Sequence, residues 1–105
     1  MGILFVAAAS AALVAQGDEA NFRYVDCMFQ VARSTDAGTD PQELSRILQR
    51  SCQDERVKYR RLAMEIQRQR GVPIKTAVSN WQQLEEDGIA SIVNARGLAE
   101  KLAQK

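Results

Sequence analysis

The sequence predicts an all-α protein, in which an antiparallel helical hairpin stapled by a disulfide precedes one or two C-terminal helices. Three observations lead to this fold class. Apolar residues recur at helical spacing between Asp40 and Gly71, and this stretch has clear start and stop signals. The two cysteines, Cys27 and Cys52, lie on opposite sides of a segment with turn composition. Helical spacing of apolar residues also continues after Pro73.

The chain opens with an uncharged, apolar run at residues 3–15. A bilayer-spanning helix needs about 20 residues, so this run fits the core of a secretory signal peptide better. Small residues at Ala15 and Gly17 predict a signal peptide at residues 1–17, with cleavage before Asp18. The first two residues carry no positive charge, which departs from the usual signal pattern. A retained membrane anchor and a buried helix of a cytosolic protein therefore stay open as alternatives.

The remaining residues, 18–105, are expected to form a single small helical domain without stable membrane insertion after cleavage. The whole chain has 105 residues, a net charge of +1, two cysteines and no histidine. Lack of histidine excludes Ser–His–Asp catalysis and mixed Cys/His zinc sites, and two cysteines cannot supply four thiolates. We therefore expect no enzyme activity, no metal and no cofactor.

The first arm of the hairpin is a helix predicted from Ala20 to about Ser34. Residues 34–39 have turn composition, and they would join this helix to the next in an antiparallel hairpin covering residues 20–71. The apolar face expected to enter the core consists of Phe22, Val25, Met28, Phe29 and Ala32.

The second arm is predicted as one long helix from Asp40 to Gly71. Asp40 is a good N-cap, Pro41 suits the first helical position, and Glu43 completes a capping box. At the other end, Gly71 can adopt the left-handed conformation that ends a helix, and Pro73 cannot continue it.

Two faces follow from the spacing within this long helix. Pairs four residues apart, Asp54 with Lys58 and Arg61 with Glu65, are expected to interact on the surface. The inner face consists of Leu44, Ile47, Leu48, Cys52, Tyr59, Leu62, Ala63 and Ile66, and the outer face carries Arg46, Arg50, Arg61 and Arg68.

The two cysteines are expected to form a disulfide between the arms. Cys27 lies about seven residues before the turn and Cys52 about twelve after it, a mismatch of about 7 Å along straight helices. A longer or splayed turn could absorb this mismatch. An exported protein favours the Cys27–Cys52 bond, whereas a cytosolic one would keep two buried thiols.

Residues 74–105 form the C-terminal helices. Trp81 falls at helical spacing with its apolar neighbours, which predicts a place in the core. Asp87 could cap a separate last helix, or one helix could run through Gly88 at a cost of about 1 kcal/mol. The acidic run that begins at Glu85 is expected to be solvated rather than to bind a cation, since successive residues of a helix do not converge. Whether this segment packs on the hairpin or forms a dimerising arm stays open, as does homo-oligomerisation.

The outer arginines Arg46, Arg50, Arg61 and Arg68 are the candidate partner-binding residues. Guanidinium groups suit carboxylate and phosphate, so the partner would be an acidic protein or an anionic component of the envelope. A plain solvated face is the alternative interpretation. Nucleic acid is not expected, because the charge is modest and no aromatic residue alternates with the arginines.

Asp26 and Cys27, with the run from Cys52 to Glu55 and Tyr59 a turn later, carry a resemblance. The pattern resembles small exported two-cysteine helical proteins of alphaproteobacteria, which have no assigned function. The close cysteine spacing of periplasmic lysozyme inhibitors is not matched. Together with the predicted signal, the resemblance implies an exported, periplasmic or secreted, non-enzymatic binding or structural protein of the bacterial envelope. The alternative is a specific inhibitor or chaperone-like protein that docks through the basic long helix.

Overall fold

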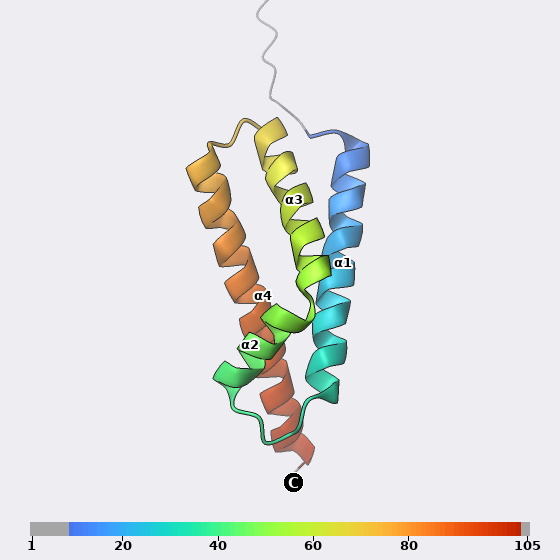
Figure 1. Cartoon of the computed structure of the whole chain (residues 1–105), viewed down its shortest axis with the longest axis vertical. Coiled ribbons are helices and arrows are strands. Elements are labelled where there is room, and N and C mark those ends of the chain that lie inside the picture. The colour runs from blue at the N-terminus through green and yellow to red at the C-terminus, as the bar shows by residue number, and fades with distance from the viewer. Residues whose placement is uncertain (1–8, 104–105) are drawn as a thin grey trace, which may run out of the picture.

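The computed structural model describes residues 9–103, and this part of the chain is built from four helices. They are α1 (Ala11–Ser34), α2 (Pro41–Ser51), α3 (Gln53–Gln69) and α4 (Ile74–Ala103). Figure 1 shows that α1 and α4 run in the same direction, while α2 crosses the bundle obliquely and α3 runs in the opposite direction. No strand occurs between residues 9 and 103, so the predicted all-α class is confirmed.

Helix α1 begins earlier than the sequence predicted. The hydroxyl Oγ of Ser10 accepts a hydrogen bond from the backbone N–H of Leu13 at 3.1 Å, which caps the helix at Ala11. Alanine-rich sequence then sustains the helix through the expected cleavage point before Asp18. Gly17 is buried in α1, and a Cβ placed on it would lie 2.8 Å from Cδ1 of Ile66 in α3. Residues 1–8 of the predicted signal peptide lie outside the described range.

The long second helix of the hairpin is interrupted, and the prediction of one continuous helix from Asp40 to Gly71 is wrong. Its start is as expected, because Asp40 caps α2 by accepting from the N–H of Gln42 at 3.3 Å. Cys52 leaves the helical region with φ −111° and ψ 34°, which separates α2 from α3. This break removes the mismatch between the two arms and brings the Cα atoms of Cys27 and Cys52 to 6.0 Å.

The predicted stop signal after α3 is confirmed. Gly71 has a φ of +77°, the left-handed conformation that favours glycine. With this turn, the N–H of Val72 reaches the carbonyl of Gln67 at 3.0 Å, a bond that satisfies an end carbonyl of α3. The chain then reverses and α4 runs unbroken through Gly88, so the alternative with a separate last helix is wrong.

The core lies where the four helices meet, and α4 packs against each of the other three. Trp81 is buried as expected, but Phe22 and Phe29 are 70% and 41% exposed. The buried face of α1 is rotated toward Tyr24, because small residues let α1 approach α3 closely on that side. The buried apolar residues are Ala20, Tyr24, Met28, Ala32, Leu44, Leu48, Cys52, Ala77, Trp81, Ile89 and Ile92.

Candidate partner-binding face of the third helix

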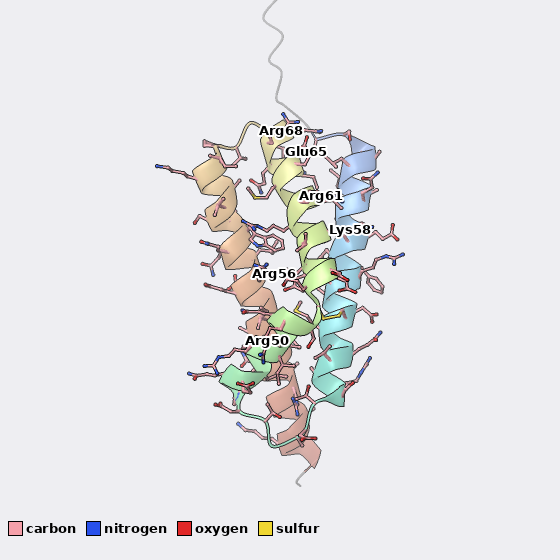
Figure 2. All side chains as sticks on the ribbon, viewed as in Figure 1. Arg50, Arg56, Lys58, Arg61, Glu65 and Arg68 are labelled. Carbon is pink, nitrogen blue, oxygen red and sulfur yellow. A yellow bond between two sulfur atoms is a disulfide. The ribbon has the colours of Figure 1, made fainter. Side chains whose placement is uncertain are left out.

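The four candidate arginines are all exposed, but the break at Cys52 divides them between two helices. Arg46 and Arg50 lie on α2, and Arg61 and Arg68 lie on α3. Figure 2 shows Arg50 below the break, with Arg61 and Arg68 along α3 above it. The single arginine stripe expected from one continuous helix is therefore two separate groups.

Local carboxylates neutralise three of these four arginines. Glu43 binds Arg46 at 3.1 Å and Arg50 at 3.5 Å, both on the surface of α2. On α3, Glu65 accepts two hydrogen bonds from the guanidinium of Arg68, and this contact lowers the pKa of Glu65. The expected pair of Arg61 with Glu65 is wrong, because Glu65 is directed to Arg68 instead.

Arg61 is consequently the candidate arginine without an ion pair among residues 9–103, and its neighbour Arg60 has none there either. Val57 and Met64 lie one helical turn to either side of them, and Val57 is 53% exposed. With Arg56, these four residues line a hollow of about 280 Å³. We call Val57, Arg60, Arg61 and Met64 the α3 basic face.

The opposite edge of this face is also cationic. Lys58 and Arg61 line a second hollow of about 130 Å³ between α3 and α1, together with Arg23. Arg23 pairs with Glu19 on α1 at 2.9 Å, whereas Lys58 has no ion pair in the described part of the chain. The expected pair of Lys58 with Asp54 is therefore wrong. Uncompensated positive charge is concentrated in the middle of α3.

A partly buried polar cluster behind this face was not predicted from the sequence. Glu85 of α4 accepts from Arg56 Nε at 2.6 Å and Nη2 at 3.0 Å, and from the hydroxyl of Tyr24 at 3.3 Å. These contacts join α1, α3 and α4. The side chain of Glu85 is 12% exposed, so it is not part of a solvated acidic run as expected. Its position four residues after buried Trp81 was the signal that could have placed it inward.

Aromatic rings pack beside this polar cluster. The ring centroids of Tyr24 and Tyr59 are 6.3 Å apart, and Tyr59 meets Trp81 edge-on at 5.1 Å. Offset and edge-to-face pairs of this kind add to the stabilisation from buried area. The basic face of α3 is thus supported from behind by a packed polar and aromatic layer.

The polar cluster predicts a loss of stability at alkaline pH. Burial, and next the Glu85 carboxylate, raise the pKa of Tyr24 far above its ordinary value of 10.0. The unfolded chain releases this proton near pH 10, whereas the folded chain keeps it, so the stabilisation is complete below pH 10 and falls above it. We expect the free energy of unfolding, measured by urea titration, to decline as pH rises above 10.

Tyr24→Phe should make that decline shallower. Burial also raises the pKa of Tyr59, so a smaller slope should remain in this variant. Identical slopes for the two proteins would show that Tyr24 does not carry the effect.

No group of three or more His, Cys, Asp or Glu side chains within residues 9–103 could hold a metal ion. None of the helices in that range is both long and apolar enough to cross a membrane. Among the described residues, the Cys27–Cys52 disulfide is the one covalent cross-link.

No family model, curated protein or solved structure matches this chain. The resemblance to exported two-cysteine proteins of alphaproteobacteria therefore stays a prediction.

Proposed function

We propose that the chain is an exported, non-enzymatic binding protein of the bacterial envelope that presents the α3 basic face to an acidic partner. The observation that carries this proposal is the pair Arg60 and Arg61. Both are exposed, and neither has an ion pair among the described residues. Guanidinium groups left without a carboxylate of their own are suited to bind one from a partner.

The disulfide supports the exported location. Disulfides persist in oxidising compartments such as the periplasm and are rare in the cytosol. The Cys27–Cys52 bond joins α1 to the junction of α2 and α3, where Cys52 is completely buried. The apolar run at residues 3–15 supports the same location independently, because it fits a secretory signal.

The scaffold supports binding because it fixes α3 along its whole length. The disulfide holds its first turn, and the ion pair of Arg56 with Glu85 holds its middle against α4. The left-handed turn at Gly71 fixes its end. A helix that is already ordered loses little entropy on binding, which favours affinity.

The α3 basic face also has the composition of a binding surface. Exposed Val57 and partly buried Met64 provide apolar area beside Arg60 and Arg61. Interfaces are enriched in Arg and Met, and an apolar centre with a charged margin is their usual anatomy. The partner surface that fits is a carboxylate-rich protein segment with one or two apolar side chains.

A specific inhibitor or chaperone-like protein is the second candidate, and the same rigid helix favours it. An inhibitor would form a stoichiometric complex with one enzyme, whereas a general binding protein would accept several acidic surfaces. A purely structural protein predicts that reversing the arginines has no effect on any complex. A pull-down from the envelope fraction with the wild-type chain separates the first two cases by the number of partners recovered.

Charge reversal tests the face directly. We expect Arg60→Glu with Arg61→Glu to raise the Kd for fluorescein-labelled poly-L-glutamate by about 10-fold or more, because like charges would then oppose each other. Fluorescence anisotropy at low salt measures this Kd. The matched control is Arg46→Glu with Arg50→Glu, which changes the net charge equally.

The control should change the Kd by less than about threefold, because Glu43 already neutralises both of its arginines. Equal effects of the two double variants would mean that net charge, and not the α3 basic face, decides binding. Absence of binding by the wild-type chain would contradict the proposal.

A further inference from the structure

One side of α4 carries exposed apolar residues at the edge of its contacts with α1 and α3. Leu84 and Leu98 are 50% and 60% exposed, although neither lies at an end of the 30-residue helix α4. Between them, Gly88, Ser91 and Ala95 continue the same side of the helix. We call these five residues the α4 seam. They follow one another in alternating steps of four and three residues, the heptad spacing by which two helices pack along their length.

The seam is continuous with an apolar groove of about 400 Å³ between α1 and α4. Ala95 belongs to both, and the groove also exposes Phe29 and Ala99. Phe22, one heptad before Phe29 on α1, is 70% exposed. Phe29 in the groove, with Leu84 and Leu98 along α4, forms the kind of exposed apolar surface that marks an interaction site.

We infer that this surface binds a second copy of the same chain, with the two α4 helices antiparallel about a two-fold axis. In a two-fold interface each contact occurs twice, so a surface must be complementary to itself. An antiparallel register that places Ser91 opposite Ala95 of the second copy also places Gly88 opposite Leu98 of the second copy. Each exposed Leu98 then fills the space beside a residue without a side chain.

The charges that flank the seam favour the same register and orientation. Asp87 precedes Gly88, and Lys101 lies three residues after Leu98, so both border the seam on one side. In the antiparallel register Asp87 faces Lys101 of the second copy, and the pair occurs twice. Opposite charges across a helix pair select partner and orientation in this way.

The seam fits a second copy better than an unrelated helix. From Leu84 to Leu98 it is about 21 Å long, enough for the full register to form with an equal length of α4. Gly88 lies opposite Leu98, and Asp87 opposite Lys101, only when α4 packs against a second α4 helix. An unrelated helix would not provide these partners. This inference does not depend on the proposed function, because the α3 basic face lies on another helix.

Sedimentation velocity on the full, oxidised chain tests the inference over a concentration series. We expect a dimer at high concentration. Leu98→Glu should raise the dimer Kd by about 100-fold or more, because it buries a charge in the seam. The matched control is Ala90→Glu, an exposed position of α4 away from the seam, which should change the Kd by less than about twofold.

A charge swap tests the register. Asp87→Lys and Lys101→Glu should each raise the dimer Kd by about 10-fold, and the double variant should return it to within about threefold of wild type. Circular dichroism verifies that each variant remains helical, and if Leu98→Glu unfolds, the charge swap decides. A wild-type chain that is monomeric throughout would overturn the inference. So would equal effects of Leu98→Glu and Ala90→Glu, or a double variant that is weaker than either single one.

Discussion

Removal of the Cys27–Cys52 disulfide should lower the free energy of unfolding by about 3.5 kcal/mol. The two cysteines are 25 residues apart, and the entropy of closing a loop of this length gives that value. The bond also anchors the junction between α2 and α3 to α1. Urea denaturation of the variant with Cys27→Ala and Cys52→Ala, compared with the oxidised wild type, measures the loss.

Two controls separate the bond from the side chains. Wild-type protein under reducing conditions should lose nearly the same stability, because the sulfur atoms remain and only the bond is absent. Hydrogen exchange should accelerate most in α2, which the bond ties to α1. A loss below about 1 kcal/mol in both experiments would show that the break at Cys52 is held by packing alone.

Replacement of Glu85 by alanine should cost about 2 to 3 kcal/mol, because it leaves the Arg56 guanidinium without its carboxylate in a mostly buried position. The side chains of Glu85 and Arg56 are 12% and 25% exposed, so the expected cost is smaller than for a fully buried ion pair. The hydroxyl of Tyr24 loses its acceptor at the same time. Urea denaturation of Glu85→Ala measures the change.

Glu86→Ala is the matched control, since Glu86 is the same residue type one position later and is exposed. We expect it to change stability by less than about 0.5 kcal/mol. A double-mutant cycle with Arg56→Met should give a coupling above about 1 kcal/mol between Arg56 and Glu85. Additive effects would mean that the two groups do not stabilise each other.

Features governed by neighbouring residues could be predicted from the sequence. Asp40 with Pro41 fixed the start of α2, and Gly71 fixed the end of α3, because caps and stops depend on local backbone chemistry. The disulfide was predictable because Cys27 and Cys52 are the two cysteines of the chain. The burial of Trp81 followed from its helical spacing.

Features that depend on contact between distant segments could not be predicted from the sequence. Helical spacing of the apolar residues favoured the face with Phe22, whereas the structure buries Tyr24 and packs Gly17, on the same face as Tyr24, against Ile66. The break at Cys52 lies where the residue is bonded to Cys27, which is 25 residues away in the sequence. In each case the deciding contact joins residues far apart in the sequence.

The candidate site shows the same division. All four arginines could be predicted to be exposed, but which of them lacks an ion pair depended on the partners of two carboxylates, Glu43 and Glu65. Glu65 is within helical reach of both Arg61 and Arg68, and it binds Arg68. The ion pair of Arg56 with Glu85 joins residues 29 apart in the sequence. Nothing in the sequence around Arg56 indicated this partner.

Non-reducing mass spectrometry of the protein isolated from the envelope fraction of its native cells tests the account most directly. Free thiols are alkylated before digestion, so that only an existing bond survives. An exported, disulfide-stapled protein should give a linked pair of peptides containing Cys27 and Cys52, without alkylation at either residue. Recovery of the chain from the cytosolic fraction, with both cysteines alkylated, would contradict an exported and disulfide-stapled binding protein.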